Sequence, residues 1–185
     1  QVTLSDPTVL VFSYMQCIGR LIDVLAPSGQ AITALHLGGG ALTLPRYVQS
    51  TRPGSHQHVV ELEREIFEVL LSALPLPEDH DIHFHYGDAR AVLEEPGADL
   101  PPSDLLIIDL FEGMHVPAHV TSREFYEQAS RYVKPDGVVA VNIPDGPGLM
   151  YAREQTATLA TVFSDVVTVI TDSRLLENDR FGNVV

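Results

Sequence analysis

The feature that most constrains the fold is a repeated succession of apolar stretch, turn and amphipathic helix that runs from Ala31 onward. Two apolar stretches, Leu105 to Ile108 and Val138 to Val141, contain no alternating polar residues, as expected of central strands that are covered on both faces. Regular alternation of strands and helices is typical of a parallel sheet between helical layers. We therefore predict an α/β protein with a doubly wound, Rossmann-like, mostly parallel sheet in a three-layer α/β/α arrangement.

The same pattern gives the bounds of the elements. We predict six or seven strands, six of which are visible as residues 33–37, 59–62, 82–86, 105–110, 138–143 and 166–170. Helices are predicted over 9–25, 41–50, 63–74 and 122–133, and a turn over 134–137. The layout is a single domain, in which residues 1–30 supply a leading helix packed on the core and residues 31–185 form the Rossmann-like part.

Composition limits the class of protein. The 25 acidic residues against 11 Lys and Arg give a formal net charge of −14, which argues against binding of nucleic acid but suits a small cationic substrate. No apolar run approaches the ~18 residues of a membrane span, and no basic, apolar leader opens the sequence. We expect a cytoplasmic protein without membrane contact. Cys17 has no second cysteine with which to form a disulfide.

A turn of three glycines, Gly38, Gly39 and Gly40, follows the first predicted strand. A backbone without side chains lets a ligand approach closely, and ligands of doubly wound sheets bind beyond the carboxyl ends of the strands, where the strand order reverses. A full dinucleotide fingerprint would need a further glycine at the position of Thr43. The turn is a candidate ligand cradle, and the alternative is a tight strand-to-helix turn without a ligand.

Acidic residues follow several predicted strands. Glu61 stands near the ~20-residue offset at which an acid receives ribose hydroxyls in such folds, unless it is only a surface residue. Asp88, after Gly87, either accepts from an adenine amino group or caps a helix. Asp109 ends the fourth strand, beside the glycine turn in the inferred topology, either as a functional carboxylate or as a strand-end turn residue. With Glu112 three residues on, it forms a pair of acids suited to deprotonating and holding an amine.

Two other chemistries are weakly indicated. Alternation places His83 and His85 on one strand face, but no third ligand or cysteine follows at zinc-site spacing. We therefore expect no metal, and interpret the histidines as ordinary polar residues: His56, His58, His80, His83, His85, His115 and His119. No serine lies in a Gly-x-Ser-x-Gly motif, which leaves a hydrolase triad without its nucleophile.

Taken in order, the motifs resemble those of a known family. They are Leu35-His36-Leu37-Gly38-Gly39-Gly40, Val60-Glu61-Leu62-Glu63, Tyr86-Gly87-Asp88, Asp104-Leu105-Leu106-Ile107-Ile108-Asp109, Glu124-Phe125-Tyr126 and Lys134-Pro135-Asp136-Gly137-Val138. Over about residues 10 to 185 the chain resembles the spermidine synthases, especially the spermidine synthase-like proteins of actinobacteria. The resemblance implies the class I S-adenosylmethionine-dependent methyltransferase fold. It also implies transfer of an aminopropyl group from decarboxylated S-adenosylmethionine to a polyamine acceptor such as putrescine.

The resemblance assigns a role to individual residues. Gly38 and Gly40 are expected to line the sulfonium ligand, Glu61 to bind its ribose and Asp88 its adenine. Asp109 is expected to be the base for the attacking amine. The partner is then a small-molecule amine. A homodimer is a possible assembly.

Two departures from the family's motifs keep alternatives open. Ala41 replaces the acid that meets the ammonium tail of the decarboxylated donor, which leaves room for a methyltransferase that uses intact S-adenosylmethionine. The sequence Leu110-Phe111-Glu112-Gly113 replaces the family's motif after the base, so that Glu112 only approximates a second acid. A nucleoside-binding or partner-binding protein that has lost catalysis is the third alternative.

Overall fold

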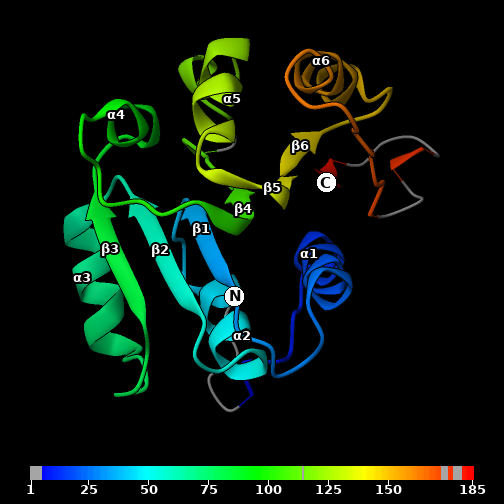
Figure 1. Cartoon of the computed structure of the whole chain (residues 1–185). Helices are drawn as coiled ribbons and strands as arrows, with labels where there is room; N and C mark the ends of the chain where they lie inside the picture. The colour runs from blue at the N-terminus through cyan, green and yellow to red at the C-terminus, as the bar shows by residue number, and fades with distance from the viewer. Residues whose placement is uncertain (1–5, 114, 172–174, 177–180) are drawn as a thin grey trace.

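The computed structural model describes residues 6–113, 115–171, 175–176 and 181–185. Its centre is a parallel sheet with the strand order β3-β2-β1-β4-β5. The strands are β1 (Thr33–Leu37), β2 (His56–Glu61), β3 (Ile82–Tyr86), β4 (Ser103–Ile108) and β5 (Val133–Val141). The doubly wound, Rossmann-like fold predicted from the sequence is confirmed (Figure 1).

Helices cover both faces of the sheet. One face carries α1 (Ser13–Leu25), α2 (Thr43–Thr51) and α3 (Arg64–Ala73), and the other carries α4 (Ala89–Glu94), α5 (Arg123–Ser130) and α6 (Met150–Leu159). In Figure 1, α4, α5 and α6 lie above the sheet, and α1 and α2 lie below it. A short 3-10 helix, η1 (Ala118–Val120), precedes α5. Four of these helices, α1, α2, α3 and α5, match the four predicted ones within a few residues at each end, whereas α4 and α6 were not among them.

The central strand β4 is buried on both faces of the sheet. Leu106 and Ile108 of β4 pack under α4 and α5, whereas Leu105 and Ile107 pack under α1 and α2. All four side chains are at most 3% exposed, as a strand without polar alternation requires. β4 lies next to β1, with Leu37 opposite Ile108. The strand order reverses between β1 and β4, so a ligand is expected beyond their carboxyl ends.

The sheet is smaller than the sequence suggests. Among the described residues it has five strands, not six or seven, and the predicted strand over 166–170 does not form. A cavity of about 740 Å³ separates this segment from β5. Its pairing is limited to an isolated antiparallel bridge between Ile170 and Val184, with two backbone hydrogen bonds between Val169 and Val185 at 2.7 and 3.0 Å. β6 (Ile143–Asp145) and β7 (Gly182–Val184) pair with each other as a separate antiparallel sheet.

The predicted turn over 134–137 is also different. These residues belong to β5, where they form an irregular bulge: Val133 pairs with Ser103, but Val138 pairs with Leu105. A β-carbon on Gly137 would lie 2.8 Å from the carbonyl oxygen of Ser103, which explains the glycine at this close approach. Within the described part of the chain, no helix is long and apolar enough to cross a lipid bilayer.

Candidate functional site

The glycine turn leaves β1 at the point where the strand order reverses. Gly38 has a φ of 96°, and a β-carbon there would overlap the carbonyl oxygen of Asp109. A β-carbon on Gly39 would lie 2.7 Å from the ring of Phe67. Gly40 also has a positive φ, of 48°, but its α-carbon faces open space. Packing therefore requires the first two glycines, while the third leaves its backbone facing open space.

Glu61 is the last residue of β2, and its side chain is hydrogen-bonded to this turn. Its Oε2 accepts a hydrogen bond of 2.9 Å from the Gly39 N–H, and its Oε1 accepts one of 3.0 Å from the Glu63 N–H. A carboxylate has about four acceptor positions, so Glu61 retains capacity for a pair of hydroxyl groups. Its placement beside the turn agrees with the sequence, and its ribose-binding role stays a prediction.

Asp88 follows β3 and caps α4. Its Oδ1 accepts from the Ala91 N–H at 3.0 Å, and its Oδ2 lies 2.7 Å from Nε2 of His119. Burial raises the pKa of Asp88, but the hydrogen bonds from His119 and Ala91 outweigh this effect and leave the pKa below its ordinary value. The neighbouring Gly87 donates its N–H to the carbonyl of Glu61 at 3.0 Å, which joins the ends of β3 and β2. The helix-capping interpretation of Asp88 is thus correct, and adenine binding would use its remaining acceptor capacity.

Asp109 follows β4 and is held by two side chains. The Tyr14 hydroxyl donates to its Oδ2 at 3.2 Å, and the Asn142 amide donates to its Oδ1 at 2.8 Å. Burial raises the pKa of Asp109, and these two hydrogen bonds oppose only part of that rise. A carboxylate with a raised pKa accepts a proton more readily than an ordinary one. The chain thus holds an oriented carboxylate of increased basicity at the switch point of the sheet.

A cavity of about 220 Å³ joins this carboxylate to the glycine turn. Its walls include Gly38, Gly39, Gly40, Ala41, Tyr14 and Asp109. The predicted adjacency of Gly38 and Asp109 is confirmed, because both residues line one cavity and the Asp109 N–H donates to the Leu37 carbonyl at 2.9 Å. The cavity is smaller than the ~300–1,000 Å³ of most small-molecule sites, and Glu61 lies outside its lining. It accommodates a small group beside Asp109 rather than a whole nucleoside.

Tyr14 and Asn142 were not predicted as site residues. Asn142 directly follows β5 and donates its N–H to the carbonyl of Ile108, so it lies at the same edge of the sheet as the other strand-end residues. The rule that selected Asp109 would have selected Asn142 as well. Tyr14 comes from α1, 95 residues away in sequence, and no spacing pattern links it to Asp109.

A buried histidine also lines the cavity. His36 is 1% exposed, and its Nε2 lies 3.0 Å from Oε1 of Gln57. Burial lowers the pKa of His36 to about 4, so the imidazole is neutral near pH 7. It adds a polar but uncharged group to the wall of the cavity.

Glu112 is not brought to this cavity. Its side chain is exposed, and its backbone N–H and carbonyl pair with those of His115 at 2.7 and 3.1 Å in a short loop. The expected pair of acids around one amine is therefore not formed, because the loop after Asp109 turns outward into solvent. Asp109 and Glu112 therefore do not face a common cavity.

Similarity to curated proteins covers most of the chain. It is 27% identical over 139 residues to the polyamine aminopropyltransferase of Vibrio vulnificus, a match that covers 75% of this chain and 45% of that protein. The chain spans about half the length of the curated relatives it matches. No family model matches the sequence.

Solved structures agree with this result. A probable spermidine synthase from Corynebacterium glutamicum superposes with a TM-score of 0.83 at 31% identity, covering 96% of this chain and 64% of that one. Human methyltransferase-like protein 13 superposes with a TM-score of 0.71 at 19% identity, covering 95% of this chain and 81% of that one, which supports the fold alone. The resemblance to spermidine synthase-like proteins and the class I methyltransferase fold are confirmed. The curated relative is a transferase, which is the enzyme class that we predict from the sequence.

Proposed function

We propose that this chain carries the catalytic domain of a transferase that moves an aminopropyl group from decarboxylated S-adenosylmethionine to a polyamine acceptor such as putrescine. The observation that carries the proposal is Asp109, an oriented carboxylate with a raised pKa that shares one cavity with the glycine turn. The similarity to polyamine aminopropyltransferases supports the same class of reaction.

The donor lies along the carboxyl ends of β1, β2 and β3 in this proposal. Gly40 lets its sulfonium end approach the backbone, because open space adjoins the α-carbon. Glu61 accepts from the ribose hydroxyls with the lone pairs that Gly39 and Glu63 leave free. Asp88 marks the adenine end, while the cavity beside Asp109 holds the reacting groups.

Asp109 then handles the proton of the acceptor amine. When bound, the donor supplies a methylene carbon next to a positive sulfur, which leaves as a neutral thioether without help from a protein acid. The Asp109 carboxylate attracts the ammonium form of the acceptor and takes the proton that the nitrogen must lose to become a nucleophile. Tyr14 and Asn142 fix the two carboxylate oxygens, so the amine meets an oriented acceptor, and much of the rate enhancement comes from this positioning.

The charge of the chain suits a cationic acceptor. The formal net charge of −14 attracts polyamines from solution, and Asp109 supplies the local negative charge in the cavity. Single amines and diamines have narrow chains, which match the small volume beside Asp109.

A methyltransferase that uses intact S-adenosylmethionine is the second candidate. Ala41 favours it, since this residue lines the cavity where an acid would meet the ammonium tail of the decarboxylated donor. The exposed position of Glu112 favours the third candidate, a nucleoside-binding or partner-binding protein without catalysis, because the cavity then lacks the second acid.

Identification of the released thionucleoside distinguishes the three. The protein is incubated with decarboxylated S-adenosylmethionine and a panel of diamines, and separately with intact S-adenosylmethionine and the same amines. Release of methylthioadenosine is the expected result. Release of S-adenosylhomocysteine would establish methyl transfer, and tight binding of either thionucleoside without turnover would establish the non-catalytic alternative.

A further inference from the structure

A second cluster of reactive side chains lies on the β2–β3 edge of the sheet, away from the glycine turn. His56 and His58 of β2 project from the same face as His83 and His85 of β3, because His58 pairs with His83 in the parallel register and successive side chains alternate. Asp81 immediately precedes β3. Five groups that bind protons or metals therefore gather on two neighbouring strands.

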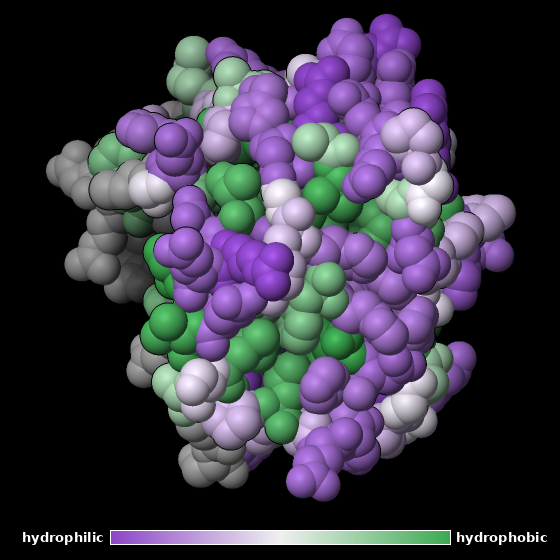
Figure 2. Space-filling model, turned by 90° about the vertical axis from the view of Figure 1, so that its left-hand side faces the viewer, coloured by the Kyte–Doolittle hydropathy of each residue, from purple (hydrophilic) through white to green (hydrophobic). Residues whose placement is uncertain are grey.

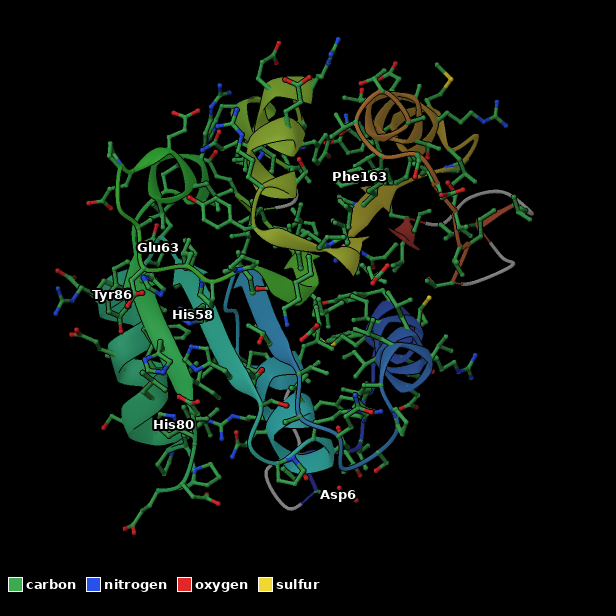
Figure 3. All side chains as sticks on the ribbon, in the orientation of Figure 1. Asp6, His58, Glu63, His80, Tyr86 and Phe163 are labelled. Atoms are coloured by element: carbon green, nitrogen blue, oxygen red, sulfur yellow. The ribbon has the colours of Figure 1, made fainter. Side chains whose placement is uncertain are left out.

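The cluster is separate from the candidate donor site. Figure 3 shows His58 beside β2 and His80 at the lower end of β3, whereas Glu63 and Tyr86 lie at the upper, carboxyl end. His56 opens β2 and Asp81 precedes β3, so both belong to the amino ends of their strands. The donor site uses the opposite ends of the same strands.

Three of these residues present their ligand atoms to one another. Asp81 lies between two imidazoles, with its Oδ2 at 2.8 Å from Nδ1 of His56 and its Oδ1 at 2.6 Å from Nε2 of His83. One ligand atom from each residue lies within 4.8 Å of the other two. Bonds of about 2.0–2.2 Å to one zinc ion require ligand atoms within about 4 Å of one another, a distance that small rotations of exposed side chains reach.

We propose that His56, Asp81 and His83 form a binding site for a divalent transition-metal ion, with Zn²⁺ as the favoured ion. Two imidazoles and one carboxylate are a ligand set that suits zinc and its neighbours in the first transition row. Three protein ligands leave a fourth position for water. The proposed aminopropyl transfer uses none of these three residues.

Further histidines hold one of the ligands in place. Nε2 of His56 lies 2.8 Å from Nε2 of His58, and Nδ1 of His58 lies 2.8 Å from Nε2 of His85. With a metal on Nδ1 of His56, its Nε2–H donates to Nε2 of His58, whose Nδ1–H donates to Nε2 of His85, so both contacts are hydrogen bonds between imidazole rings. Such outer hydrogen bonds orient the ligand ring and typically change metal affinity by ~10- to 100-fold.

The site is open to solvent. The side chains of His56, Asp81 and His83 are 40%, 49% and 52% exposed, so an ion reaches them without a rearrangement of the core. Figure 2 looks onto the α3 and β3 edge and shows hydrophilic side chains over much of this face. The net charge of −14 adds a long-range attraction for cations.

Calorimetric titration of the tag-free, metal-free chain with Zn²⁺ tests the proposal. We expect one ion per chain and a loss of affinity of at least about tenfold in both Asp81→Asn and His83→Gln. His115→Gln, which removes an exposed histidine from the loop after β4, is the matched control and should bind Zn²⁺ as the wild type does. Absence of Zn²⁺ binding by the wild type, or equal affinity in all four proteins, would overturn the proposal and leave two ordinary histidine–aspartate ion pairs.

Thermal unfolding gives a second readout that needs no enzymatic activity. An ion that binds only the folded chain raises the unfolding temperature as its concentration increases. Zn²⁺ should raise the unfolding temperature of the wild type and of His115→Gln, and should leave His83→Gln unchanged. Equal shifts in the three proteins would contradict the assigned ligands. The unfolding temperatures of the metal-free variants are compared with that of the metal-free wild type, which shows whether the substitutions leave the fold intact.

Discussion

The carbonyl oxygen of Asp109 occupies the space that a β-carbon on Gly38 would fill. The loops that follow β1 and β4 are therefore in direct backbone contact, and the Asp109 N–H strengthens the contact by donating to the Leu37 carbonyl at 2.9 Å. The glycine turn and the candidate base form one structural unit, so a change in the turn also moves Asp109.

Gly38→Ala is expected to lower the free energy of unfolding by about 2–5 kcal/mol, because the new methyl group meets backbone and the residue has a positive φ. Gly40→Ala is the control, since it has a positive φ but open space, and should cost only about 1–2 kcal/mol. Urea denaturation measures both. Equal losses would show that the contact with Asp109 imposes no constraint.

Glu61→Ala is expected to weaken the binding of methylthioadenosine by about 1–3 kcal/mol, because ribose hydroxyls lose a charged acceptor and the turn loses its fastening at Gly39. Calorimetry measures the affinity. The control is Glu65→Ala, an exposed acid in the first turn of α3. If both variants bind as the wild type does, Glu61 is not part of the ligand site.

Much of this site could be predicted from the sequence. The unbroken apolar run of β4 indicates a central strand, and the topology of doubly wound sheets then places the residue after it beside the glycine turn. Asp109 and Gly38 follow from this argument alone. The position of each residue directly after its strand is enough to predict its place, because parallel strands bring their carboxyl ends to one edge of the sheet.

The predictions that the structure corrects concern contacts between distant elements. The segment 166–170 has the composition of a strand, but a cavity separates it from β5, and its backbone pairs only at Val169, with Val185. Glu112 was placed beside Asp109 because of its short separation in sequence, yet its loop turns outward.

Tyr14→Phe is expected to shift the acid limb of the kcat/KM profile to higher pH. Burial raises the pKa of Asp109 and the Tyr14 hydrogen bond lowers it, so loss of the hydroxyl raises the pKa further. The carboxylate is the active base, and activity is then lost sooner as the pH falls, by up to about one pH unit. Tyr47→Phe, whose hydroxyl faces Asp23 at 3.4 Å, should leave the profile unchanged. A Tyr14→Phe profile identical to the wild type would contradict the assigned role.

His36→Gln is expected to make stability less sensitive to acid. The pKa of His36 is about 4 in the folded chain, whereas an unfolded histidine titrates near ~6.5. Between these pH values the unfolded chain binds a proton that the folded chain does not, so the free energy of unfolding falls as the pH falls, by up to about 3 kcal/mol at pH 4. Glutamine does not titrate and can still donate to Gln57. Urea denaturation at pH 7 and pH 5 should show a smaller loss in the variant, and equal losses would contradict the buried neutral state of His36.

The most direct test of the account is the turnover of Asp109→Asn with decarboxylated S-adenosylmethionine and putrescine, measured together with its affinity for methylthioadenosine. Asparagine keeps the shape of the side chain but cannot take the proton of the amine. We predict that release of methylthioadenosine falls by about 10²- to 10⁴-fold while the affinity changes little. Equal turnover in wild type and variant would contradict the role of Asp109 as the base, and absence of turnover in the wild type with every amine tested would contradict the proposed transfer itself.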